Sequence, residues 1–235
     1  TWVKWFVGLL VGAVVVVVVA VPVALLATKE EKKPDPRRTY TLDDYFGDQL
    51  RTKSYSLRWI SDNEYLHRSR ENNLLLINVD TGESKQILSN TTINNSNASY
   101  YDLSPDRQYA LMQYNYEKLW RHSNTASYRI VNIQTQSLIT GNELPQGIQY
   151  MTWSPVGHKL VYVWENNIYI RNAPEEQSVQ ITTNGEENRI LNGIPDWVYE
   201  EEMFSTNYAL WWSPNATFLT YVEFNDSGVP IIEYS

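Results

Sequence analysis

The chain has 235 residues, which is enough for one or two domains of ordinary size. Its composition, 43% hydrophobic and 20% charged, is that of a globular protein and excludes a disordered or collagen-like chain. The net charge of −8 argues against a basic nucleic-acid-binding domain, and the absence of cysteine excludes disulfide scaffolds, thiol catalysis, iron–sulfur clusters and zinc fingers.

The first predicted element is a membrane-spanning helix over Trp5–Ala27. This stretch has no charged side chain, and as a helix it would span roughly 34 Å, more than the ~30 Å hydrocarbon core of a bilayer. A cleaved signal peptide usually has a shorter apolar region of about 7–15 residues, so we expect a retained anchor. The predicted organisation is a cytoplasmic tail over 1–4, the transmembrane helix over 5–27, a charged stalk and lead-in over 28–50, and a β-rich body over 51–235.

Two signals disagree on the orientation of this helix. Only Lys4 precedes it whereas five basic residues follow within the stalk, and by the positive-inside rule this would put the body in the cytosol. Against this, the body carries five N-glycosylation sequons, which favour an extracellular location. The sequon asparagines are Asn90, Asn94, Asn97, Asn215 and Asn225. We therefore expect type II topology.

The body has the sequence pattern of an all-β fold. Short alternating runs are separated by turn-rich segments, and a strand–turn–strand unit repeats around serines that are 43, 50 and 59 residues apart. These serines are Ser61, Ser104, Ser154 and Ser213. A period of roughly 40–50 residues with several strands per unit is typical of β-propeller blades. We predict about four blades, either as a complete small propeller or, as the unequal spacing favours, as part of a larger ring.

The chain has no recognisable catalytic machinery of its own. It has no Gly-x-Ser-x-Gly elbow and no glycine-rich phosphate loop, and its three histidines have no metal-ligand spacing. We therefore predict no catalytic residue, no metal site and no cofactor within this chain.

Two clusters nevertheless have the chemistry of a binding site. Glu200, Glu201 and Glu202 follow one another between aromatic residues, and Arg121 lies in a second aromatic-rich segment. Carboxylates that converge repel unless a cation binds between them, so they would receive an ammonium group, and a nearby Arg would hold a carbonyl or carboxylate. The alternative is a solvated acidic helix, in which successive side chains diverge by about 100°, with Arg121 as an ordinary surface cation.

These segments resemble the family of dipeptidyl peptidase IV and fibroblast activation protein, within the prolyl-oligopeptidase-type serine peptidases. The motifs that carry the resemblance are Tyr55–Ser61, Leu119–Ser123, Trp153–Leu160 and Asn192–Glu202. Gly141–Pro145 and Met203 favour the fibroblast activation protein branch, whereas Tyr114–Tyr116 and Arg121–Ser123 favour the dipeptidyl peptidase IV branch.

The resemblance implies a type II plasma-membrane serine peptidase that removes dipeptides from peptide N-termini when the second residue is proline or alanine. In this family an eight-bladed propeller caps an α/β-hydrolase domain and the active form is a dimer. Carried over, Glu201 and Glu202 would bind the substrate's N-terminal ammonium and Arg121 its backbone carbonyl region. The catalytic serine, aspartate and histidine lie beyond the matched region, so we expect the hydrolase domain to be absent from this chain.

A function of a different class remains open on the sequence alone. The chain would then be a non-catalytic, membrane-anchored interaction module, either a truncated product or an inactive relative similar to channel-associated dipeptidyl-peptidase-like subunits. The acidic pair and Arg121 favour the peptidase, since an inactive protein has no need of an ammonium site. A Gly-x-Ser-x-Gly motif further along the protein would discriminate between the two.

Overall fold

The computed structural model describes residues 2–27, 39–47, 50, 57–230 and 232. The chain divides into two compact units, Thr1–Ser54 and Tyr55–Ser235, which are described separately. Most of the predicted stalk, and its boundary with the body at 50/51, lie outside the described residues, so the predicted domain limits remain predictions. The first unit contains α1 (Trp2–Ala27) and the short α2 (Leu42–Phe46).

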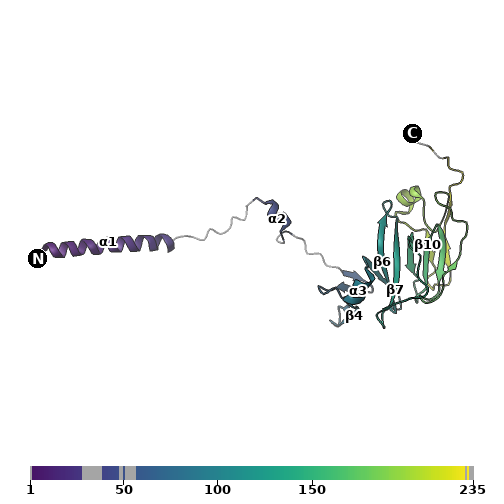
Figure 1. Ribbon diagram of the computed structural model, residues 1–235, viewed down its shortest axis with the longest axis horizontal. Coiled ribbons are helices and arrows are strands. Elements are labelled where there is room, and N and C mark those ends of the chain that lie inside the picture. Colours follow the sequence, from purple (N-terminus) through teal and green to yellow (C-terminus); the bar gives the residue numbers. More distant parts are fainter. Residues whose placement is uncertain (1, 28–38, 48–49, 51–56, 231, 233–235) are drawn as a thin grey trace. The chain divides into compact units, whose positions relative to one another are not determined.

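Helix α1 has the length and composition of a membrane span (Figure 1). The stretch Trp2–Ala24 has a mean hydropathy of 3.0, and none of it is buried against the rest of the described chain. Lipid cannot hydrogen-bond to the backbone, so an apolar segment in the membrane is helical even when it is rich in β-branched valine. The helix begins three residues before the stretch predicted from the sequence, and it includes Lys4 and Pro22.

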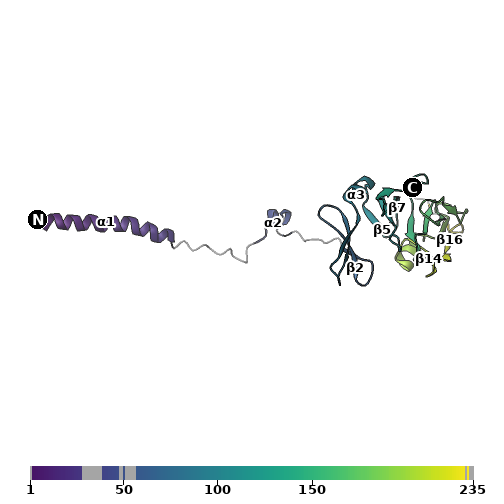
Figure 2. The ribbon, with the colours of Figure 1, turned by 90° about the horizontal axis from the view of Figure 1, so that it is seen from below.

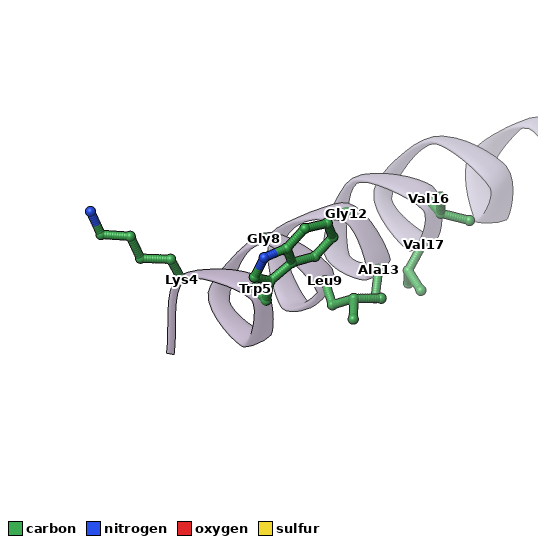
Figure 3. Close-up of a pocket in the computed structure, with 8 residues that line it drawn as sticks. All are labelled: Lys4, Trp5, Gly8, Leu9, Gly12, Ala13, Val16 and Val17. Atoms are coloured by element: carbon green, nitrogen blue, oxygen red, sulfur yellow. The ribbon is translucent and has the colours of Figure 1, made fainter. Parts of the chain in front are cut away.

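One flank of α1 is hollowed where Gly8 and Gly12 leave the backbone uncovered (Figure 3). A Cβ atom added at either glycine would meet nothing within 4 Å. The groove is lined by Lys4, Trp5, Gly8, Leu9, Gly12, Ala13, Val16 and Val17. It contains none of the predicted substrate-binding residues.

The second unit is built from antiparallel sheets that follow one another in chain order (Figure 2). Three sheets have four strands each, and in every one of them neighbouring strands are consecutive in the sequence. The first sheet has β1 (Leu57–Trp59), β2 (Glu64–Arg68), β3 (Leu74–Asn78) and β4 (Ser84–Leu88), followed by helix α3 (Asn90–Ser96). The second has β5 (Tyr100–Leu103), β6 (Tyr109–Lys118), β7 (Asn124–Asn132) and β8 (Ser137–Leu138). The third has β9 (Tyr150–Trp153), β10 (Leu160–Trp164), β11 (Asn167–Arg171) and β12 (Val179–Gln180).

The remaining strands form two short ladders. They are β13 (Ile190–Asn192), β14 (Leu210–Trp212), β15 (Leu219–Tyr221) and β16 (Glu223–Asn225), in which β13 pairs with β16 and β14 with β15. Between β13 and β14 lies η1, a π-helical turn (Tyr199–Phe204).

Ser61, Ser104 and Ser154 lie in the turns that join the first two strands of the three four-stranded sheets, and Ser213 lies in the turn between β14 and β15. Ser104 shows the mechanism: its N–H donates to the carbonyl oxygen of Tyr109 at 2.9 Å, and its hydroxyl accepts from the N–H of Tyr109 at 3.0 Å. Ser154 and Ser213 make the same backbone bond to the residue five positions on, each at 2.8 Å. The turn satisfies its own polar groups, which explains why it recurs around Ser104, Ser154 and Ser213. At Ser61 the turn is tighter, and its N–H donates to the Glu64 carbonyl at 3.3 Å.

The hydrophobic core lies between successive sheets. On β6, Ala110 and Met112 pack toward the first sheet, whereas Tyr109 and Leu111 pack toward the third. Side chains alternate between the two faces of a strand, so the second sheet is buried on both faces. Each aliphatic side chain buried in this way contributes about 1.5–3 kcal/mol. Four-stranded meanders stacked face to face fit a β-propeller, while the number of blades remains a prediction.

Candidate functional site

The acidic cluster lies on an excursion from a strand. The N–H of Gly193 donates to the Val222 carbonyl, the N–H of Val222 donates to the Ala209 carbonyl, and the N–H of Ala209 donates to the Gly193 carbonyl, all at 2.8–2.9 Å. β13 and β14 therefore pair with adjoining parts of one partner segment, β15–β16. The chain leaves the sheet after Gly193 and returns at Ala209, and the residues between them, 194–208, form what we call the 194–208 excursion.

Local hydrogen bonds shape the excursion into a helical turn. The carboxylate of Asp196 accepts from the N–H of Tyr199 at 2.9 Å, and the carbonyl of Asp196 accepts from the N–H of Glu200 at 2.8 Å. The π-helical turn η1 ends at Ser205, which has a left-handed backbone with φ of +52°. π-Helical turns are rare and are frequent at functional sites.

Arg121 lies at the tip of the long hairpin formed by β6 and β7. The register of this hairpin shifts between Tyr114 and Glu117, where Asn115 has a φ of +48°. Such bulges re-aim the chain at sheet ends and beside active sites. Beyond the bulge, the N–H of Leu119 donates to the Ser123 carbonyl at 3.0 Å and closes the tip.

The hairpin tip and η1 meet through an ion pair. Arg121 Nε lies 2.9 Å from Glu201 Oε2, and the backbone N–H of Arg121 donates to Glu201 Oε1 at 3.2 Å. The Glu201 side chain is 6% exposed whereas that of Arg121 is 70% exposed. The two predicted site residues, 80 positions apart in the chain, therefore lie side by side, with a largely buried carboxylate at the base of an open guanidinium.

The side chain of Glu202 is exposed and makes no hydrogen bond or ion pair with any residue that the structure describes. The three consecutive glutamates thus have three different environments: Glu200 is buried, Glu201 is bonded to Arg121, and Glu202 faces solvent. This is the divergence expected along a helical turn. It leaves Glu202 free to receive a cation from solvent.

Reasoning from the sequence did not assign Glu200 a role of its own. Its side chain is buried, and Oε1 accepts from the backbone N–H groups of His122 at 2.8 Å and Ser123 at 2.9 Å. It is the first of three identical residues, and its burial depends on a hairpin 78 positions away. No spacing or composition signal could have identified it.

A polar cavity lies between the hairpin and the end of the excursion. It measures about 390 Å³ and is lined by Tyr116, Asn124 and Tyr128 from the hairpin region, by Tyr150 from β9, and by Asn207 from the excursion. Burial raises the pKa of Tyr150 to about 12, so this hydroxyl remains protonated at neutral pH. The cavity therefore offers neutral hydroxyl and amide groups together with the carboxyl group of Asp102.

The other predicted sites are at the surface of the described chain. All five sequon asparagines are exposed: Asn90, Asn94, Asn97, Asn215 and Asn225. Within the described residues, no group of three or more His, Cys, Asp or Glu side chains is arranged to hold a metal ion.

Comparison with known proteins identifies the family. Residues 104–235, more than half of the chain, match the model of the dipeptidyl peptidase IV (DPP IV) N-terminal region. The chain belongs to this family. The resemblance inferred from the sequence motifs is therefore confirmed.

The chain is similar to two branches of the family. It is 53% identical to dipeptidyl peptidase 4 of Bos taurus over 99% of this chain, and 50% identical to prolyl endopeptidase FAP of Bos taurus over all of it. These matches span only 30% and 31% of the length of those relatives. A more distant relative is the inactive dipeptidyl peptidase 10 of Rattus norvegicus, 33% identical over 88% of this chain and 26% of that protein.

A solved structure shares the fold. The structure of Porphyromonas gingivalis dipeptidyl peptidase 4 superposes with a TM-score of 0.64 and 28% sequence identity, covering 75% of this chain and 26% of that one. The β-rich unit is thus the fold of the N-terminal region of a dipeptidyl peptidase.

Proposed function

We propose that this chain is the N-terminal part of a type II membrane serine-type dipeptidyl peptidase, which releases Xaa-Pro and Xaa-Ala dipeptides from peptide N-termini. In this proposal the chain supplies part of an eight-bladed propeller and the group that binds the substrate's N-terminus. The single observation that carries the proposal is the Arg121–Glu201 ion pair beside the exposed Glu202.

The chemistry of that group suits a primary ammonium. An ammonium has three N–H donors and no acceptor, and each carboxylate oxygen can accept more than one hydrogen bond. Glu201 keeps acceptor capacity beyond its two bonds to Arg121, and Glu202 has all of its own. An ammonium that contacts both carboxylates would pair with the charge of Glu202, which has no ion pair within the described residues. The exposed guanidinium of Arg121 would then meet the first carbonyl oxygens of the peptide.

Anchoring the ammonium would also set the cleavage position. A substrate fixed at its N-terminus presents one particular peptide bond to a nucleophile at a fixed distance. Binding energy at the remote end then orients the scissile bond. We expect the nucleophilic serine and its aspartate and histidine partners in a hydrolase domain of the whole protein.

The proposal is tested in the full-length protein displayed on cells. Glu201→Ala or Glu202→Ala should abolish cleavage of a Gly-Pro amide while surface expression stays at the wild-type level. Turnover close to that of wild type in both variants would refute the assignment of the two carboxylates.

The alternative function is a non-catalytic, membrane-anchored interaction module. The observation in its favour is the 33% identity to a relative whose name describes it as inactive. Against it stands the acidic pair with Arg121, which a protein without substrate does not require. Absence of a Gly-x-Ser-x-Gly motif from the full-length protein would favour this alternative.

The proposal extends to the setting of the protein. We expect the β-rich unit on the extracellular side of the plasma membrane, glycosylated at some of its exposed sequons, with α1 in contact with membrane lipid. We also expect the full-length protein to be a homodimer with peptides as substrates and with no nucleic-acid partner.

A further inference from the structure

The buried carboxylate of Glu200 has no part in the ammonium site described above. Its side chain is 1% exposed, and burying a carboxylate is costly unless hydrogen bonds compensate. Oε1 makes two such bonds, to the N–H groups of His122 and Ser123. Within the described part of the chain, Oε2 is buried and has no hydrogen-bond partner. A buried carboxylate with only one of its two oxygens hydrogen-bonded is unusual, so its presence calls for a structural or functional explanation.

The partners of Glu200 indicate this explanation. The N–H groups of three consecutive residues, Arg121, His122 and Ser123, all donate to carboxylates of the same helical turn. Two of the three bonds go to Glu200. Bonds from a backbone N–H to a carboxylate are about twice as strong as neutral ones. The tip of the hairpin is therefore fixed to η1 mainly through its backbone and mainly by Glu200.

The backbone bonds to Glu200 are important because few other contacts fix the position of Arg121. Its side chain is 70% exposed, and among the residues that the structure describes it forms an ion pair with Glu201 alone. Its neighbours Leu119 and Trp120 are also exposed, so packing contributes little to the position of the tip. The position of the guanidinium therefore depends on the backbone of residues 121–123 together with the ion pair to Glu201.

We propose that Glu200 is a positioning residue, which clamps the hairpin tip so that Arg121 and Glu201 face the bound peptide in one geometry. It acts through backbone amides and does not touch the substrate. The effect on substrate binding rests on the proposed function, whereas the clamp itself does not.

The unpartnered Oε2 provides a conservative variant. In Glu200→Gln the side-chain carbonyl oxygen can accept both backbone bonds, and the amide nitrogen takes the place of the oxygen that has no partner. Glu200→Gln should therefore retain the clamp and lose only the charge, whereas Glu200→Ala loses both. A direct ammonium ligand would respond differently, because the charge is then essential.

The experiment measures hydrogen exchange of the peptide spanning 119–123, together with KM and kcat for a Gly-Pro amide, in the full-length protein. Glu200→Ala should speed exchange at this tip by about tenfold or more, as expected for the loss of charge-assisted bonds. KM should rise by about fivefold or more with a smaller change in kcat, since a free tip must be ordered at a cost in binding. Glu200→Gln should remain within about threefold of wild type in both measurements. A neutral acceptor keeps about half of the strength of the carboxylate bonds, so the variant loses only about half of the free energy that Glu200→Ala loses.

A matched control removes a similar clamp elsewhere. Gln136 holds the N-terminus of α3 through its side chain, which accepts from the Ser89 N–H at 2.9 Å and donates to the carbonyls of Ile87 and Ile133. Gln136→Ala should loosen that region and leave the hairpin tip and KM unchanged. If Glu200→Ala does not fold, Glu200→Asp, whose carboxylate is one methylene shorter, serves instead.

Two results would overturn the inference. One is unchanged exchange at the tip in Glu200→Ala. The other is a KM in Glu200→Gln as high as that in Glu200→Ala, which would make Glu200 a ligand of the ammonium. If wild type does not cleave the Gly-Pro amide, the proposed function fails, and the exchange data still decide whether Glu200 clamps the tip.

Discussion

At the scale of single residues, the proposed role of Arg121 in substrate binding rests on its contact with Glu201. Arg121 is open to solvent on one side and paired with the largely buried Glu201 on the other. We expect Arg121→Ala in the full-length protein to raise KM for a Gly-Pro amide by roughly 10- to 100-fold, as for the loss of a charged hydrogen bond. Steady-state kinetics check this. A KM within a factor of two of wild type would contradict a role for Arg121 in binding.

Asp106 gives the folded state a dependence on acid pH. Burial alone would raise the pKa of this carboxyl, but hydrogen bonds from Ser104, His158 and the Gln108 N–H outweigh it and hold the pKa below 3.8. A lowered folded-state pKa stabilises the protein above the unfolded value, and this contribution is lost as pH falls from 3.8 through the folded value. Asp106→Asn should therefore lose less stability than wild type on acidification.

Urea unfolding of the full-length protein between about pH 5 and pH 2 measures this difference. The matched control is Asp62→Asn, at an exposed position in the corresponding turn of the first sheet. It should follow the wild-type pH dependence. An Asp106→Asn variant that loses stability as steeply as wild type would contradict the expectation.

At the scale of elements, Gly193 is the point where the strand gives way to the 194–208 excursion. Its φ is +73°, and a Cβ there would lie 2.9 Å from Leu210 Cδ2 and 3.1 Å from Ile168 Cδ1. Gly193→Ala should therefore destabilise the protein by about 2 kcal/mol, through backbone strain and overpacking together. Gly82→Ala is the matched control, because its φ is +70° but a Cβ there meets nothing within 4 Å.

The control should cost only about 1 kcal/mol, the penalty of the left-handed backbone alone. Denaturant midpoints of the two variants separate strain from packing. Equal midpoints would mean that the neighbours of Gly193 move aside without cost.

The elements also show what the sequence could and could not predict. The turn around Ser104 recurs because its hydrogen bonds are local, so a strand–turn–strand unit was visible in the residues themselves. The excursion was not visible in the sequence. β13 and β14 look like two unrelated strands there, and only their pairing with β15–β16 shows that residues 194–208 interrupt one continuous strand. The proposed ammonium site rests on residue type and family resemblance, whereas the burial of Glu200 arises from a tertiary contact that no local pattern indicates.

At the scale of the whole molecule, we expect α1 to anchor the protein in a membrane. The full-length protein should stay with membranes after alkaline carbonate extraction, and removal of residues 1–27 should release it, since the helix is the one described segment apolar enough to span a bilayer. Release of the intact protein by carbonate would contradict a spanning anchor.

Topology is tested separately by the exposed sequons. If the β-rich unit is extracellular, glycosidase treatment should lower the apparent mass, and Asn→Gln changes at the used sites should remove part of that shift. A full-length protein from intact cells that shows no shift would favour the cytosolic orientation that the basic stalk suggests.

The most direct test of ammonium recognition by Glu201 compares two substrates in wild type and in Glu201→Gln. The substrates are a Gly-Pro amide with a free amino group and the same compound acetylated at its N-terminus. If Glu201 binds the ammonium, the substitution should lower kcat/KM for the free amine by about 10-fold or more and leave the acetylated substrate unchanged within a factor of about three. An equal loss for both substrates would mean that Glu201 supports the structure alone and does not recognise the N-terminus.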